Sequence, residues 1–117
     1  MLETFSPIFN PEKYRNQIVD IVHIDSLRKT ANGEKPAEID DRNKAIQVLL
    51  LIEKLQQAGI TIRFVDDPLI FNPPPNFQNI VIGGAYVGQC LADYAATIKK
   101  LGYKFQVDPV LSLKLGI

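Results

Sequence analysis

Two units with the same order of elements limit the folds open to this chain: an amphipathic helix, a glycine and a short apolar strand. Gly59 follows the first helical pattern and Gly102 follows the second. Glycine commonly takes the left-handed backbone conformation that ends a helix. Asp and Pro follow both strands and stop them, at 66–68 and at 108–109. Such a repeated order is typical of a parallel α/β sheet with right-handed crossovers.

The helices of the two units are predicted from apolar residues that recur at helical spacing. The first helix is predicted over 42–58 and the second over 88–101. The buried stripe expected of the first consists of Ala45, Val48, Leu49, Ile52 and Leu55, widened by Ile46 and Leu50. The apolar face expected of the second consists of Leu91, Tyr94, Ala95, Ile98 and Leu101.

Two further strands are predicted outside these units. Residues 17–24 are rich in β-branched side chains, and a polar loop is expected after them at 25–41. Residues 78–82 form the other strand, before a glycine-rich turn at 83–88. The predicted fold is a small doubly wound, three-layer α/β fold (Rossmann-like) with a parallel sheet of about four strands. The nearly continuous apolar character of 17–24 suits a central strand. This strand and 78–82 are therefore predicted to lie in the centre of the sheet, with the strands of the two units at its edges.

The 117 residues are expected to form a single domain. Residues 1–13 read as an irregular N-terminal arm, because prolines interrupt them. Residues 68–77 form a Pro-rich connector with three consecutive prolines. A simple crossover is favoured for this connector over a proline-recognition motif, because no basic residue flanks it. The tail, 110–117, is expected to add a short edge strand or to pack on the core.

Charge and composition limit the classes of partner. Thirteen basic and thirteen acidic residues give a net charge of zero, which argues against a nucleic-acid or anionic-membrane surface. The longest strictly apolar run, 48–52, is too short to span a membrane. A single cysteine and the absence of a signal-peptide pattern predict a cytoplasmic location. A single histidine beside that cysteine predicts no metal site, and no nucleotide motif is complete, so no cofactor is expected.

Candidate site residues gather where the carboxyl ends of the predicted strands meet, the edge at which open parallel sheets bind ligands. Asp25 follows the first strand, Asp66 follows the second in chain order, and Cys90 lies in the first turn of the helix after the third. The positive end of a helix dipole favours a nucleophilic thiolate, and a nearby carboxylate can accept the thiol proton. The alternative is that Cys90 is a buried, inert thiol.

The sequence around Cys90 resembles the isochorismatase-like cysteine hydrolases. That family has an apolar strand, a glycine, a cysteine six residues later, an alanine five beyond the cysteine and Gly-Tyr twelve beyond it. These intervals are kept by Gly84, Cys90, Ala95, Gly102 and Tyr103. Residues 45–67 resemble the family's first helix and second strand, and 21–25 resemble its first strand.

The resemblance implies a Cys–Asp–Lys hydrolase in which Cys90 attacks a carbonyl and Asp25 is its base. A non-proline cis peptide would fall around Ala85-Tyr86, and the amides of Tyr86 and Cys90 would form the oxyanion hole. Gly84 and Ala85 lie in the same stretch. Together with Asp66 at the end of its strand, Gly84, Ala85 and Tyr86 are the expected oxyanion and ligand-binding residues.

The chain departs from this family where the catalytic lysine belongs. Residues 66–78 contain no lysine and are too few for the strand and helix that the family places there. This favours a non-catalytic or degenerate isochorismatase-like domain that acts in small-ligand binding or protein assembly. The alternative is a small cysteine hydrolase acting on an amide or ester through Cys90 and Asp25. Both edge strands of the predicted sheet are exposed, so a homodimer is expected to cover them.

Overall fold

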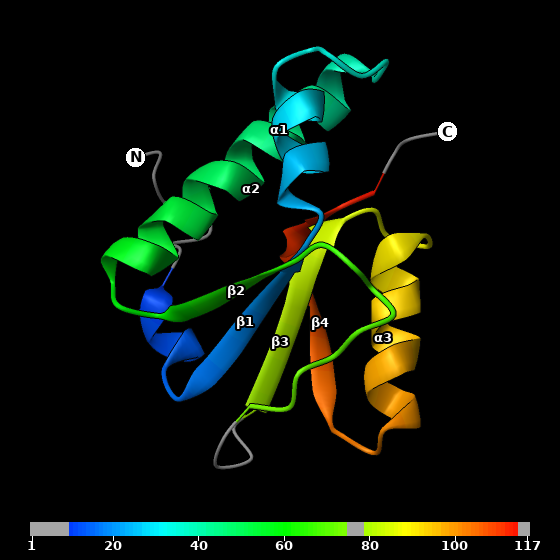
Figure 1. Ribbon diagram of the computed structural model, residues 1–117. Coiled ribbons are helices and arrows are strands. Elements are labelled where there is room, and N and C mark those ends of the chain that lie inside the picture. Colours follow the sequence, from blue (N-terminus) through cyan, green and yellow to red (C-terminus); the bar gives the residue numbers. More distant parts are fainter. Residues whose placement is uncertain (1–9, 75–78, 115–117) are drawn as a thin grey trace.

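Four parallel strands form one sheet in the order β2–β1–β3–β4 (Figure 1). The computed structural model describes residues 10–74 and 79–114. In chain order the elements are η2 (Pro11–Tyr14), β1 (Gln17–Val22), α1 (Ile24–Ala31), α2 (Ile39–Gln57), β2 (Thr61–Val65), β3 (Asn79–Ala85), α3 (Cys90–Lys100) and β4 (Phe105–Leu113). The predicted parallel α/β fold and its central strands, β1 and β3, are confirmed.

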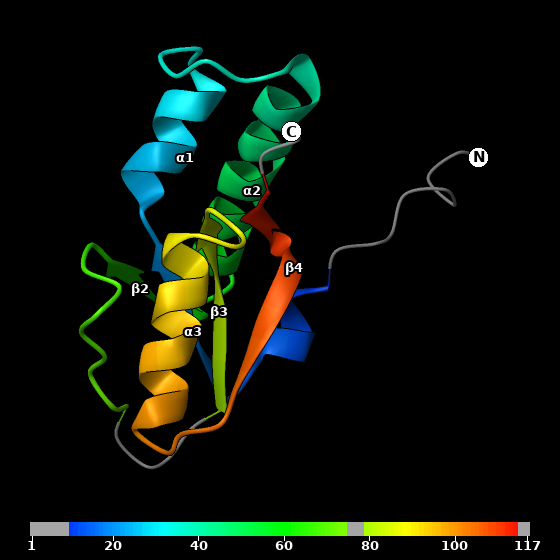
Figure 2. The same cartoon turned by 90° about the vertical axis from the view of Figure 1, so that its right-hand side faces the viewer.

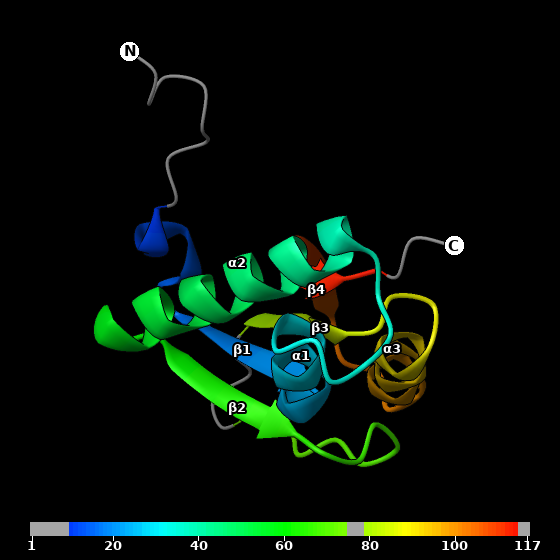
Figure 3. The same ribbon diagram turned by 90° about the horizontal axis from the view of Figure 1, so that it is seen from above.

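Helices cover both faces of the sheet, which makes the fold three-layered and doubly wound. α2 lies on one face and α3 on the other, whereas α1 lies beyond the carboxyl ends of the strands and packs against α2 (Figures 2 and 3). The sheet therefore has a hydrophobic core on each face, and alternate residues of β1 point into different ones. Val19 and Ile21 pack with the buried side of α2, whereas Val22 packs with α3. Every residue of β1 after Gln17 is buried, as its nearly continuous apolar sequence predicts.

Helix α1 lies in a segment for which a loop was expected, so the loop prediction is wrong for 25–31 and for 39–41, where α2 begins, whereas 32–38 form a loop as predicted. β1 ends at Val22, and His23 turns the chain with a left-handed φ of 52°. Ile24, Leu27 and Thr30 then form the buried side of α1, at the spacing of one helical turn. The polar residues between them are the solvent face of an amphipathic helix, which explains why the segment resembles a loop by composition.

The apolar stripe of α2 is narrower than predicted. Ala45, Val48, Ile52 and Leu55 are buried, but Ile46 and Leu50 are 42% and 54% exposed. The sheet is only four strands wide, and α2 buries one side against it and α1, so residues on the opposite side face solvent. In α3 the prediction is likewise wrong for Leu101, which follows the last helical turn and is exposed.

Strand β3 continues through two glycines that were expected to start a turn. A Cβ atom at Gly84 would overlap the backbone of Val22 in β1, and one at Gly83 would lie 2.6 Å from the carbonyl oxygen of Leu111 in β4. Gly84 also has a φ of 112°, a conformation that other residues avoid. The glycines are therefore required because neighbouring strands approach β3 closely, and they do not form a phosphate-binding turn.

Strand β4 passes through Asp108-Pro109, where the sequence predicted its end. The register shifts from Ile82 opposite Val107 to Gly84 opposite Ser112, so β4 bulges between its two paired parts. Proline is tolerated in an edge strand at such a bulge because no ladder hydrogen bond is needed there. Residues 110–113 of the predicted tail thus belong to the edge strand, which was one of the two positions predicted for the tail.

The termini and the connector are partly described. Of the predicted arm, Pro11–Tyr14 forms the 3-10 helix η2, in which the Asn10 side chain accepts a hydrogen bond from the Glu12 amide. Residues 1–9, 75–78 and 115–117 lie outside the described residues. None of the helices in the described segments is long and apolar enough to cross a membrane.

Gly84→Ala should lower the free energy of unfolding by about 3 kcal/mol or more, because its methyl group would overlap the β1 backbone. Gly102→Ala is the matched control, since Gly102 also has a positive φ, of 87°, but a Cβ atom there would meet nothing within 4 Å. The control should cost only about 1–2 kcal/mol. Urea denaturation of both variants tests this, and equal losses would contradict it.

Candidate functional site

The turn that joins β3 to α3 carries most of the predicted site. Ala85 ends β3, Cys90 begins α3, and Tyr86 lies at the start of the turn between them. The Ala85–Tyr86 peptide bond is cis, where the resemblance places such a bond. Gly84 and Ala85 are buried within the sheet, so they shape the turn through their backbone.

Three backbone amides of this turn have no acceptor among the described residues: those of Tyr86, Gly88 and Cys90. Their neighbours are bound, because the Val87 amide donates to the Leu113 oxygen at 2.9 Å and the Gln89 amide donates to the Tyr86 oxygen at 3.0 Å. No side chain caps the start of α3. Free amides at a helix start can stabilise an oxyanion, so this part of the arrangement fits the predicted oxyanion hole.

Among the described residues, no hydrogen bond joins the predicted base to the predicted nucleophile. Cys90 is half-buried, and its thiol makes no hydrogen bond with Asp25 or any other described residue. Asp25 lies in the first turn of α1, its side chain is 76% exposed, and Arg28 lies 3.4 Å from its carboxylate. Because β1 ends at Val22 rather than at residue 24, Asp25 starts a helix instead of following a strand. A Cys90–Asp25 pair stays a prediction.

A lysine from outside the family's lysine segment reaches the turn. Lys35 follows α1, and its Nζ lies 5.2 Å from the centre of the Tyr86 ring and 3.2 Å from the Ser26 hydroxyl. The hydroxyls of Tyr86 and Thr30 are hydrogen-bonded at 2.9 Å. The segment from α1 to Lys35 therefore packs on the ring next to the cis bond. The Asn32-Gly33 turn is the local sequence signal for this return.

A buried charged cluster on the α3 face was not predicted. Asp20, in the middle of β1, is fully buried. The Arg63 side chain of β2 donates to both of its carboxylate oxygens, at 2.7 and 2.8 Å. The Tyr94 hydroxyl of α3 donates to the same carboxylate at 2.6 Å. The polar interruption of an apolar strand at residue 20 was the only sequence signal of this cluster, and its partners lie far away in the chain.

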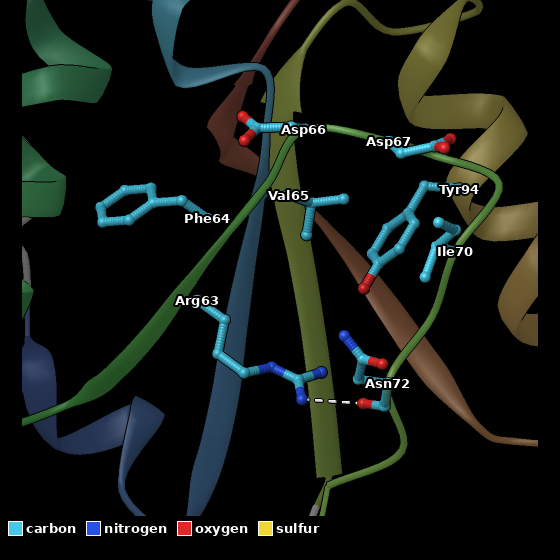
Figure 4. A pocket seen from close by; sticks show the side chains of 8 residues that line it. All are labelled: Arg63, Phe64, Val65, Asp66, Asp67, Ile70, Asn72 and Tyr94. Atoms are coloured by element: carbon cyan, nitrogen blue, oxygen red, sulfur yellow. Dashed lines mark hydrogen bonds between the residues drawn. The ribbon is translucent and has the colours of Figure 1, made fainter.

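A cavity of about 170 Å³ lies beside this cluster, at the carboxyl end of β2 (Figure 4). It is lined by Arg63, Phe64, Val65, Asp66, Asp67, Ile70, Asn72 and Tyr94. Arg63 donates to the Asn72 carbonyl oxygen at 2.7 Å, and its charge is balanced by Asp20. Figure 4 shows Phe64 and Asp66 pointing away from Tyr94. The predicted ligand residue Asp66 is therefore at the rim, where it and Asp67 disfavour an anionic ligand.

Burial and the hydrogen bond to Asp20 raise the pKa of the Tyr94 hydroxyl above its ordinary value. Burial and a hydrogen bond to the Asp108 carboxylate raise the pKa of Tyr14 in the same way. Both hydroxyls act as structural donors, since ionising either one would place two negative charges side by side. Within residues 10–74 and 79–114, no three potential metal ligands come together.

Tyr94→Phe should lose stability near neutral pH, because Asp20 then lacks one donor. The stability deficit of the variant relative to the wild type should shrink above about pH 10, by about 1.4 kcal/mol per pH unit at most. A raised pKa stabilises the fold below the ordinary tyrosine pKa, and this contribution is lost as the unfolded tyrosine ionises. Urea denaturation at neutral and alkaline pH measures the deficit, and a pH-independent value would contradict the assignment.

Comparison with known proteins found no relatives. No family model, no curated protein and no solved structure matches this chain. The resemblance to the isochorismatase-like hydrolases stays a prediction that depends on the residues quoted for it.

Proposed function

We propose that this chain is a non-catalytic isochorismatase-like α/β domain that functions in protein assembly, by adding a strand of a partner to the free edge of β2. The observation that carries the proposal is a difference between the two edge strands of the sheet. β4 contains a proline and a bulge, two features by which proteins block unwanted strand pairing, whereas β2 contains neither.

The edge of β4 is blocked at its centre. Asp108 is buried and hydrogen-bonded to the Tyr14 hydroxyl, and Pro109 has no amide hydrogen. The next amide, that of Val110, donates to the Asp108 side chain at 2.9 Å. A bulge at the same place interrupts the register. An incoming strand therefore finds no regular row of donors and acceptors along β4.

The edge of β2 is regular, and no strand of residues 10–74 and 79–114 pairs with it. Its pairing with β1 is one-to-one from Thr61 to Val65, and it contains no proline. Its only charged residue, Arg63, is bound to Asp20, so its guanidinium is directed toward the sheet interior and not along the edge. The His23 amide donates to the Val65 oxygen. Because backbone groups alternate along a strand, the amides and carbonyls of Ile62 and Phe64 point outward.

The predicted catalytic pair supports the non-catalytic part of the proposal. Asp25 is mostly exposed and pairs with Arg28, and no hydrogen bond joins its carboxylate to Cys90 among the described residues, which supports a non-catalytic role. A nucleophile of this kind needs an adjacent base or a strongly favoured thiolate.

Iodoacetamide should label Cys90 of the folded protein no faster than that of the unfolded chain near neutral pH. Cys90 is the single cysteine, so the modified fraction read by mass spectrometry reports this site alone. Asp25→Asn should leave the rate unchanged. Labelling that is at least tenfold faster in the folded protein, and slowed by Asp25→Asn, would contradict the non-catalytic proposal.

The second candidate is a small cysteine hydrolase that acts on an amide or ester through Cys90 and Asp25. The free amides of Tyr86 and Cys90 and the lysine over Tyr86 favour it. In this case Lys35→Met should slow the labelling of Cys90, whereas the matched variant Lys29→Met, on the exposed side of α1, should not. Under the assembly proposal neither substitution changes the labelling rate.

A peptide with the sequence of residues 59–67 should bind to the edge of β2 in dilute protein. We expect it to shift the amide resonances of Ile62 and Phe64 and to slow their hydrogen exchange. Phe64→Lys should abolish both effects, because it places a charge on the edge. The matched control is Val107→Lys, on the other edge strand, where the exposed fraction of the native side chain is similar (40% against 45%). Effects on β4 alone, or none at all, would contradict the proposal.

A further inference from the structure

We propose that the partner strand comes from a second copy of this chain, so that two β2 strands pair antiparallel about a two-fold axis and join two four-stranded sheets into one. This inference rests on the proposed function of the β2 edge. It adds the identity of the partner, the direction of the strand and its register.

The backbone of β2 is complementary to itself in this arrangement. With the axis at Arg63, Ile62 lies opposite Phe64 of the second copy, and Phe64 lies opposite its Ile62. These two residues carry the outward amides and carbonyls, so each opposed pair exchanges two hydrogen bonds, as antiparallel neighbours do. A parallel strand would leave the two copies unrelated by a closed two-fold axis.

The side chains of the edge are also suited to a second copy. Ile62 packs against the core beneath α2, and Phe64 extends from the same side of β2 and is 45% exposed. Each cross-strand pair therefore brings Ile62 of one copy against the Phe64 ring of the other, which covers the ring. Arg63 lies at the axis, but its guanidinium is directed toward Asp20 and Asn72 of its own chain.

The two ends of β2 have opposite charge. Asp66 and Asp67 follow its carboxyl end and are exposed. At the amino end, Arg15 donates to the Ala58 carbonyl oxygen at 3.0 Å, but its charge is paired with Glu12, so the basic charge there comes from Lys54 in the last turn of α2. An antiparallel partner brings the acidic end of one strand to the basic end of the other, twice in the dimer. This charge complementarity favours the antiparallel direction over the parallel one.

Light scattering of the full chain at submillimolar concentration should give twice the 13.1 kDa mass of one chain. Phe64→Lys should return the mass to that of a monomer. Leu50→Lys, on the outward side of α2, is the matched control because Leu50 is also large, apolar and half-exposed; it should remain dimeric. A monomeric wild type, or a dimer that is lost in Leu50→Lys and kept in Phe64→Lys, would overturn the inference.

Cross-linking tests the register. In a Cys90→Ala background, a mixture of Ile62→Cys and Phe64→Cys chains should form a disulfide between them. The opposed Cα atoms of such a pair lie about 5.5 Å apart, within the range of a disulfide. Either variant alone should stay reduced, because its two cysteines are diagonal neighbours, roughly 7–8 Å apart. Cross-linking of the single variants instead of the mixture would overturn the register.

These measurements separate the inference from the proposed function. A monomeric chain whose Ile62 and Phe64 amides are still protected by the 59–67 peptide would show that the edge takes a strand, but not from a second copy. Such a result would overturn only the inference. A monomeric chain with no protection by the peptide would overturn both.

Discussion

The buried Asp20 carboxylate is the interaction on which the rest of the structure depends. Burying an ionised group in the middle of a sheet is costly unless it is paired and hydrogen-bonded. Arg63 supplies the charge and two hydrogen bonds, and Tyr94 supplies a third. These contacts join the central strand to an edge strand and to helix α3 on that face. Arg63 also binds the Asn72 carbonyl oxygen, which holds the segment after β2 against the sheet.

Much of the fold could be predicted because its determinants are local. Gly59 and Gly102 mark the helix ends, and the apolar run of β1 indicates a central strand. Helix α1 was missed because its buried residues are few and its composition is polar. The requirement for Gly83 and Gly84 could not be foreseen in the same way, since it arises from the approach of Leu111 and Val22, which are distant in the chain.

In the candidate site, too, the features with local determinants could be predicted and those that depend on distant contacts could not. The cis bond and the free amides belong to one short turn, so intervals within that stretch were sufficient to place them. The position of Asp25 depends on where β1 ends, and the left-handed His23 shifts that end by two residues. Lys35 could not be predicted from the resemblance, because it lies outside the segment in which the family carries its catalytic lysine. Contacts that depend on how α1 packs could not be derived from spacing.

The pairing of Arg63 with Asp20 has a consequence for colloidal behaviour. In most edge strands a charged side chain acts as a gatekeeper that keeps folded molecules apart. Here the only charged side chain of β2, that of Arg63, is bound to the buried Asp20. The contact that stabilises the monomer therefore also withdraws this charge from the edge. Stability of the fold and protection of the strand edge thus make opposite demands on Arg63. If the β2 edge accepts a strand as proposed, the occupant that covers it would also keep the folded molecules from pairing without limit.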